Sequence, residues 1–349
     1  MNSFNDTMDT TYLYSLLNTI GVSGFESDVC LSFADYIKND VDDVHFDTMG
    51  SAIAFLKGKK SDSAIMIEAH ADEIGFQVLH ISESGYVYIR RNGGIDEQCL
   101  PGSQVVIQTR DRNLIPGVIG KKPIHLQKVE ERKSTLETHH VWVDTGLTTE
   151  EVRHHITIAD PVAFAPNMKK LGEHRISSKS LDNKLGLFVI SQVIKRIAHR
   201  THQSDIYGVA TVQEEVGSRG AVTTGYSINP DIAITVDLDF ATDVPDCIPS
   251  RYGLVTLGGG VVIPRNADCN LSLSQQMEDL AQKHNIPYQL SARPHATGGT
   301  NTARLQLSRS GIKTLSLGIP CRYMHTPVEV CDLRDVVSAI SLLEAFCLL

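Results

Sequence analysis

The sequence has no paired cysteines and no long apolar runs. Its 349 residues include seven cysteines, and no two of them form a Cys-x-x-Cys pair. An odd number of cysteines without short spacing argues against a disulfide framework and against a thiolate zinc site. No apolar run approaches the ~20 residues that a membrane-spanning helix needs, and the polar N-terminus lacks a signal-peptide pattern. We therefore expect a protein of the reducing cytoplasm with no membrane partner.

Aromatic residues and clustered positive charge are also scarce. Aromatic residues make up 6% of the chain, and the formal net charge is -9. Nucleic-acid-binding surfaces carry clustered lysine and arginine, whereas the basic residues here are scattered. We therefore expect no nucleic-acid partner. The chain is 42% hydrophobic, which is ample for one large domain or for a domain with an insert.

Apolar strand-like runs alternate with helical periodicity in two parts of the chain. Strands are predicted at residues 51–58, 63–70, 205–213, 231–237 and 311–320. Helices are predicted at residues 23–40, 181–200, 274–285 and 332–348, and Ser23 and Glu26 have the spacing of a capping box at the first of them. This alternation predicts an α/β fold, with a mixed, mostly parallel sheet sandwiched by helices.

The segment between these two parts has a different texture. Short predicted strands lie at residues 76–82, 86–91, 104–110, 114–120, 139–144 and 160–166, separated by glycine, proline and charged turns. Only residues 148–155 have a helical pattern. The spacing predicts a small β-barrel inserted into the α/β domain. We assign residues 1–75 and 166–349 to the α/β domain and residues 76–165 to the insert.

Histidine and acidic residues recur at the ends of the predicted strands or at a helix start. They are His70, Asp72, Asp182, Glu214, Glu215, Asp237 and His325. In an open α/β sheet, ligands bind outside the carboxyl ends of the strands, so these side chains are expected to converge. Imidazole and carboxylate are ligands for zinc, cobalt or manganese. One ion would need three or four of them, and two ions sharing a carboxylate would use five.

Each of these residues also has an ordinary interpretation. A Glu-Glu pair is commonly a solvated turn, Asp182 suits a helix N-cap, and His325 suits a surface loop. A metal centre instead gives Glu214 and Glu215 separate tasks, one as a ligand and one as a proton acceptor. Asp72 would then orient the imidazole of His70 through its second nitrogen.

Two other classes of function remain open at this point. A metal-free glycosidase would use two carboxylates, but neighbouring residues of a strand point to opposite faces, which places Glu214 and Glu215 poorly for that task. A non-catalytic binding protein would leave the ligand set unexplained. The glycine-rich stretches at 257–260 and 297–300 are interpreted as loops in which the backbone approaches a site closely.

Five motifs, in this order, resemble the tetrahedral (TET) di-metal aminopeptidases, which include glutamyl and deblocking aminopeptidases. They are "HADEIGF", "LDNK", "TVQEEVGSRGA", "VDLDFATDVP" and "RYMHTPVEV". In the insert, "VWVDTGLTTEEV" and "ADPVAF" resemble the inserted domain of the family. The resemblance covers about residues 10 to 345 and implies a zinc-exopeptidase-like fold.

The resemblance also implies a ligand set. His70, Asp182 and Asp237 would hold one divalent ion, and Asp182, Glu215 and His325 would hold the other, with Asp182 bridging. The ions would be zinc or cobalt, with manganese as an alternative. The implied reaction is the hydrolysis of N-terminal residues from peptides by a water bridged by the two ions.

Further implications concern the second glutamate and the assembly. Glu214 would be the general base, Asp72 would orient His70, and the Asp72–Glu73 bond would be cis. The insert would form dimers that assemble into a tetrahedral dodecamer. Two positions depart from the family pattern, because Asn301 stands where an aspartate is common and Lys184 where an arginine is common.

Overall fold

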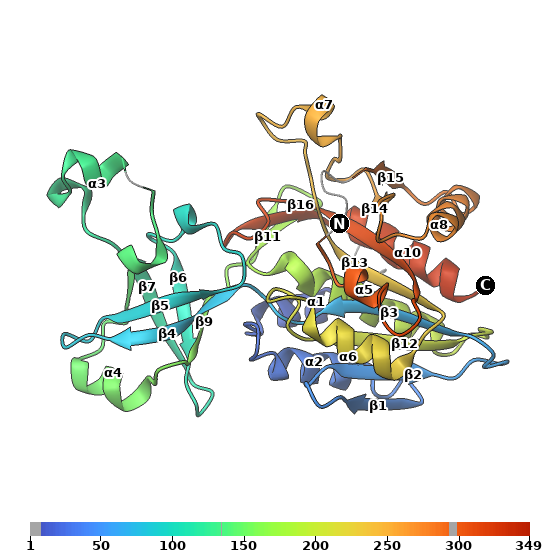
Figure 1. Ribbon diagram of the computed structural model, residues 1–349, viewed down its shortest axis with the longest axis horizontal. Helices are drawn as coiled ribbons and strands as arrows, with labels where there is room; N and C mark the ends of the chain where they lie inside the picture. Colours follow the sequence, from blue (N-terminus) through green and yellow to red (C-terminus); the bar gives the residue numbers. More distant parts are fainter. Residues whose placement is uncertain (1–7, 134, 293–298) are drawn as a thin grey trace.

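The computed structural model describes residues 8–133, 135–292 and 299–349. Figure 1 shows two bodies, a large α/β part and, at its side, a smaller part built on β-strands with two short helices, α3 and α4. The chain enters the smaller body after β3 (Ala64–His70), the third strand of the large sheet, and returns before β10 (Lys169–Leu171), the fourth strand of that sheet in chain order.

An 11-stranded mixed sheet forms the centre of the large body. Its main path is β1 (Asp43–Phe46), β2 (Ala52–Leu56), β12 (Asp205–Thr211), β3 (Ala64–His70), β13 (Ile232–Phe240), β16 (Lys313–Arg322), β17 (Glu329–Asp332), β11 (Arg175–Ser178) and β10 (Lys169–Leu171). β14 (Val261–Pro264) pairs with β16 and with β15 (Tyr288–Ser291). The four central strands β12, β3, β13 and β16 are parallel, and the strands of the main path outside them pair antiparallel.

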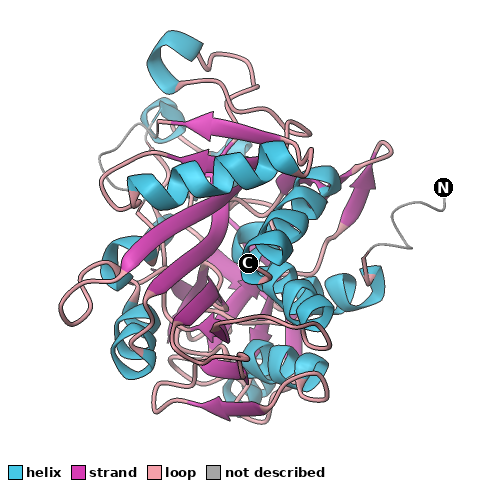
Figure 2. Cartoon of the chain, turned by 90° about the vertical axis from the view of Figure 1, so that its right-hand side faces the viewer, coloured by secondary structure: helices cyan, strands magenta, loops and turns pink. Residues whose placement is uncertain are grey.

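Helices cover both faces of this sheet (Figure 2). One face carries α1 (Thr10–Asn18), α2 (Ser27–Ile37), α5 (Leu181–Ile197), α8 (Leu271–Lys283) and α10 (Leu333–Cys347). The other carries α6 (Arg219–Ile228) and α9 (Thr302–Leu305), and the short α7 (Pro249–Tyr252) stands apart from both. The central strands are buried on both faces, which explains their continuous apolar runs. The predicted fold class is confirmed.

The smaller body is a closed six-stranded barrel. Its strands, in spatial order, are β4 (Gly75–Ile81), β5 (Val87–Asn92), β8 (Trp142–Asp144), β7 (Leu114–Gly120), β6 (Gln104–Gln108) and β9 (Pro161–Phe164). It also carries α3 (Val129–Lys133), α4 (Thr149–His155) and three 3-10 turns, η1 (Glu97–Cys99), η2 (Ile124–Leu126) and η3 (Thr138–His140). Its interior is a separate hydrophobic cluster that includes Phe76 and Phe164. The domain boundaries assigned from the sequence stay a prediction.

The capping box predicted at the first long helix is wrong. α2 begins at Ser27, and its N-cap residue Glu26 makes no side-chain capping bond. Ser23 Oγ instead donates to Asp72 Oδ2 at 2.6 Å. Glu26 Oε1 accepts the N–H groups of Gly24 and Gln213, at 2.7 and 3.1 Å. Both side chains therefore tie their loop to distant segments of the chain.

The seven cysteines all lie within the described residues, and none of them forms a disulfide. Within the described residues, no helix combines the length and the apolar character needed to cross a bilayer.

Candidate metal centre

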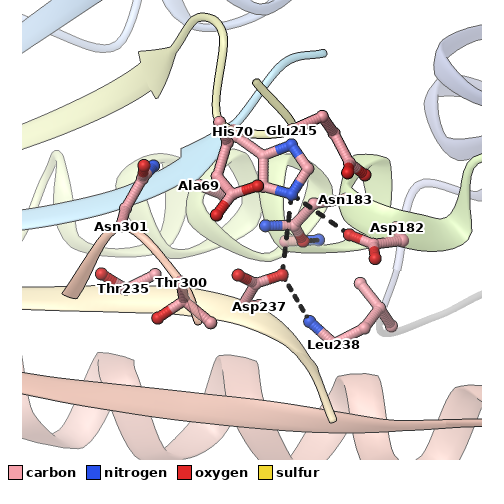
Figure 3. Close-up of polar contacts among 12 residues, drawn as sticks. Ala69, His70, Asp182, Asn183, Glu215, Thr235, Asp237, Leu238, Thr300 and Asn301 are labelled. Atoms are coloured by element: carbon pink, nitrogen blue, oxygen red, sulfur yellow. Dashed lines mark hydrogen bonds and ion pairs between the residues drawn. The ribbon is translucent and has the colours of Figure 1, made fainter. Parts of the chain in front are cut away.

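The predicted site residues meet near the carboxyl ends of the parallel strands (Figure 3). His70 is the last residue of β3, and Asp237 lies in β13. Asp182 is in the first turn of α5, and Glu215 follows the end of β12. His325 lies in the hairpin loop between β16 and β17. Five separate segments thus contribute to one cluster.

Asp182 lies between the two histidines. Its Oδ1 is 3.1 Å from His70 Nε2, and its Oδ2 is 3.5 Å from His325 Nε2. Asp237 Oδ1 is 3.7 Å from His70 Nε2, and Glu215 Oε1 is 3.5 Å from His325 Nε2. Each oxygen of Asp182 therefore faces a different histidine, and each histidine faces one further carboxylate.

Two overlapping ligand sets result. The ligand atoms of His70, Asp182 and Asp237 lie within 4.8 Å of one another, as do those of Asp182, Glu215 and His325. Imidazole nitrogens and carboxylate oxygens at this spacing suit divalent zinc, cobalt or manganese. The donor set fits two ions that share Asp182.

Burial and mutual repulsion perturb the charges of the cluster. Burial raises the pKa of Glu214 to about 8, and repulsion by Asp237 and Asp72 adds to the effect against the attraction of His70. Burial also lowers the pKa of His70, but its contacts with Asp182, Asp237 and Asp72 outweigh burial and hold that pKa well above its usual value. Glu214 therefore resists ionisation unless positive charge is near, whereas the burial of Asp182 is outweighed by the two histidines, which hold the pKa of Asp182 below its usual value.

In the second ligand set, burial and neighbouring charges also shift the pKa values of the carboxylate and the histidine. Burial and repulsion by Asp182 raise the pKa of Glu215 well above its usual range. The pKa of His325 rises to about 10, because the hydrogen bond to Asp182 and the charge of Glu215 outweigh burial. Two divalent cations would supply positive charge to the carboxylates of both ligand sets.

The paired glutamates lie beyond the strand, which corrects the expected alternation. β12 ends at Thr211, and Gln213 adopts a left-handed backbone with φ 59°. The strand rule therefore does not separate the two side chains, and the ligand atoms of Glu214 and Glu215 lie with that of His70 within 4.8 Å of one another. The N–H groups of Glu214 and Glu215 donate to the two oxygens of Asp72, at 2.9 and 3.0 Å.

Asp72 also faces the imidazole of His70, as the sequence predicts. Its Oδ1 lies 3.3 Å from His70 Nδ1, and its backbone carbonyl oxygen lies 3.0 Å from the same nitrogen. These contacts leave Nε2 of His70 turned toward Asp182 and Asp237. The predicted cis bond at Asp72–Glu73 is wrong, because the single cis bond among the described residues is Asp182–Asn183. The cis bond therefore follows Asp182, which lies between the two histidines, and does not follow Asp72.

Sequence reasoning missed two contributors to the site. Glu329 accepts the backbone N–H groups of His325 and Asp182, and its only sequence signal is its place in the "HTPVE" stretch. The barrel contributes Gly94, where a Cβ atom would lie 3.2 Å from His325 Nδ1. Asp96 N–H donates to the His325 carbonyl at 3.2 Å. The insert therefore forms part of the wall of the site.

The two positions that depart from the family pattern lie beneath the cluster. Asn301 is buried, and its Nδ2 donates to Glu68 Oε2 at 2.9 Å and to Thr211 Oγ1 at 2.8 Å. Lys184 donates to Glu73 Oε1 at 3.1 Å and to the carbonyl of Thr19. Both positions belong to buried polar networks next to the ligands.

The glycine-rich stretch at 257–260 serves a different carboxylate. The N–H groups of Gly258 and Gly260 donate to Asp335, at 2.8 and 2.7 Å. The close backbone approach predicted there occurs, but outside the ligand set. The stretch at 297–300 lies partly outside the described residues.

Comparison with known proteins places this arrangement among peptidases. Residues 50–342 match the family described as M42 glutamyl aminopeptidase. Lysyl aminopeptidase of Pyrococcus furiosus is 33% identical over 344 residues, covering 97% of this chain and 96% of the relative. An aminopeptidase structure from the archaeon Desulfurococcus kamchatkensis is 36% identical with a TM-score of 0.90, covering 97% and 95% of the two chains. The TET1 peptidase of Pyrococcus horikoshii, described as assembling into a tetrahedron or a large octahedral shell, is 28% identical with a TM-score of 0.86, covering 97% and 98%.

Proposed function

Because the chain belongs to the M42 glutamyl aminopeptidase family and is a metal-dependent aminopeptidase, we propose that it works with two divalent ions. His70, Asp182 and Asp237 hold one ion, and Asp182, Glu215 and His325 hold the other. Zinc or cobalt suits these ligands best, and manganese is the alternative. Family membership confirms the resemblance seen in the motifs and sets aside the glycosidase and the non-catalytic interpretations.

One observation carries the two-ion proposal. Asp182 turns one oxygen toward each histidine, at 3.1 and 3.5 Å. A single ion bound by one set would leave the histidine and the second carboxylate of the other set without a metal to coordinate. A bridging carboxylate explains why both sets converge on the same side chain.

Glu214 is the proposed proton carrier. When bound, the ions would lower the pKa of a coordinated water and polarise the scissile carbonyl. Glu214 then accepts the proton from the attacking water and delivers it to the leaving amine. The ligand atom of Glu214 lies within 4.8 Å of those of His70 and Glu215, and Ser218 Oγ donates to Glu214 Oε1 at 3.3 Å, so this carboxylate lies beside the proposed ligands, where a general base is needed.

The substitution Glu214→Gln tests this role. It keeps the size of the side chain but removes the proton acceptor, so kcat should fall by about 10²- to 10⁴-fold on aminoacyl-nitroanilides. Metal content, measured by inorganic mass spectrometry, should stay at two ions per chain. Glu83→Gln, at the exposed turn between β4 and β5, is the matched control and should change neither value. Near-normal turnover by Glu214→Gln would exclude Glu214 as the general base.

We also propose that the barrel mediates assembly into a homo-oligomer, with dimers arranged as a tetrahedral dodecamer. The P. horikoshii neighbour is described as forming a tetrahedron or an octahedral shell. On the barrel, Ile124, Leu126 and Val129 are 58, 68 and 60% exposed and adjoin in sequence, which is typical of a contact surface. Sedimentation velocity should give the mass of twelve chains, and Leu126→Glu should give smaller species with the barrel still folded. A monomeric wild-type chain would contradict the proposal.

A further inference from the structure

Glu329 is a buried carboxylate that links two proposed ligands through their backbones. It is the first residue of β17 and is 1% exposed. Oε1 accepts the N–H of His325 at 2.9 Å, and Oε2 accepts the N–H of Asp182 at 3.0 Å. Both oxygens are thus committed to segments that present ligands, and Asp182 lies 147 positions away in sequence.

The backbone that Glu329 holds lies in an irregular loop, where Asp96 N–H also donates to the His325 carbonyl and Asn167 Nδ2 to the Pro327 carbonyl. β16 and β17 pair only through Cys321–Cys331 and Arg322–Val330, so residues 323–328 lie outside the ladder. His325 itself has φ 64°, in the left-handed region that residues with a side chain seldom adopt. The hydrogen bond from that N–H to Glu329 Oε1 favours the conformation that turns the imidazole toward Asp182.

The backbone around Asp182, the second residue that Glu329 holds, is also irregular. Ser180, two residues earlier, has φ 50°, and the helical conformation of α5 is interrupted at Asp182 and Asn183. The Asp182 N–H therefore has no place in a regular helical ladder. The carboxylate of Glu329 supplies its acceptor and sets where the helix start lies relative to the hairpin.

Asp72 has the same construction at the other side of the centre. It accepts the N–H groups of Glu214 and Glu215, which follow the left-handed Gln213. In both cases one buried carboxylate ties together two residues of the centre next to a left-handed residue. Asp72 and Glu329 are thus both buried carboxylates that accept backbone N–H groups of residues in the cluster.

We propose that Glu329 is a positioning residue that sets the separation of Asp182 and His325 for the second ion. The proposal rests on the proposed function, because it assigns the role to the Asp182, Glu215 and His325 set. Partners behind metal ligands fix the orientation of the ligands, and their loss typically weakens metal binding about 10- to 100-fold. Glu329 bonds to the backbone N–H groups of Asp182 and His325 rather than to their side chains.

The substitution Glu329→Gln is the first test. Glutamine keeps the shape but offers one acceptor, and its amide group turns an N–H toward one of the two backbone donors. Stepwise Co²⁺ titration of the metal-free protein, followed by visible absorption, should show one ion binding about 10- to 100-fold more weakly than in wild type. Glu329→Asp keeps the charge but is too short to reach both donors. It should give an intermediate loss, and it serves as the test if the glutamine variant does not fold.

Asp335→Asn is the matched control. Asp335 is another buried carboxylate that accepts two backbone N–H groups, but from Gly258 and Gly260. Its replacement should lower the melting temperature while both Co²⁺ affinities stay at wild-type values. If Glu329→Gln also lowers only the melting temperature, Glu329 is a structural residue and the inference is wrong. A wild-type chain that binds fewer than two Co²⁺ ions would instead overturn the proposed function.

Discussion

Two buried clusters of ionisable groups lie side by side in this molecule, and they balance their charge differently. Glu73 directly follows Asp72 and is 2% exposed. Its oxygens lie 2.5 Å from Lys179 Nζ and 3.1 Å from Lys184 Nζ. Burial alone would raise the pKa of Glu73, but the two lysines lower it to about 2. This lysine cluster carries its counter-charge within the chain.

The metal centre has more carboxylates than counter-charges, because Asp182, Glu214, Glu215 and Asp237 face two histidines whose pKa values are raised. The perturbing partners of Glu214 and Glu215 are other carboxylates and two histidines. Buried carboxylates are costly unless paired with positive charge or a metal. The excess of carboxylates over histidines in this cluster supports the proposal that bound ions supply further positive charge there.

Removing the shared carboxylate of Asp182 should change the metal centre more than any other substitution considered. Asp182→Asn leaves one neutral oxygen where two charged ones faced the histidines, so both ions should bind poorly and activity should fall by more than about 10³-fold. Metal content should drop below one ion per chain, and circular dichroism should remain that of the folded protein. Retention of two ions would exclude Asp182 as the bridge.

A substitution in the lysine cluster should instead lower the stability of the fold and leave metal binding unchanged. Lys184→Met removes one of the two lysines that pair with Glu73 and the donor to the Thr19 carbonyl, and it should destabilise the fold by about 1–3 kcal/mol, measured by denaturant unfolding. Lys195→Met is the control, because Lys195 pairs with Asp40 at the surface at 2.6 Å and should cost less than about 1 kcal/mol.

Metal content separates the two clusters further. Lys184→Met should still bind two ions per chain, because Lys184 balances Glu73 rather than any ligand. Equal stability of the Lys184 and Lys195 variants would show that the lysine cluster contributes nothing particular to the fold.

The sequence predicted those parts of the site that depend on strand periodicity. Continuous apolar runs located β3 and β13, and the residues near their ends, His70 and Asp237, met as expected. It failed where long-range contacts outweigh a local pattern. Ser23 and Glu26 have capping-box spacing but bond to residues 49 and 187 positions away. No local rule could assign a role to Glu329, because its second partner lies at the start of α5.

Asp335 is a third buried carboxylate, and backbone N–H groups of Gly258 and Gly260 donate to it. Replacing it should have the smallest effect and tests whether such groups keep a buried carboxylate ionised. Burial raises its pKa from 3.8 to about 7. Between these values the folded state holds a proton that the unfolded state has released, so the stability contributed by Asp335 falls as pH rises.

Asp335→Asn removes this titration. Its free energy of unfolding, relative to wild type, should therefore rise by about 2 kcal/mol between pH 5 and pH 8. Urea unfolding of both proteins at several pH values measures the difference, which cancels the titration of the remaining carboxylates. A difference that stays constant with pH would mean that two backbone N–H groups are sufficient to keep the buried carboxylate ionised.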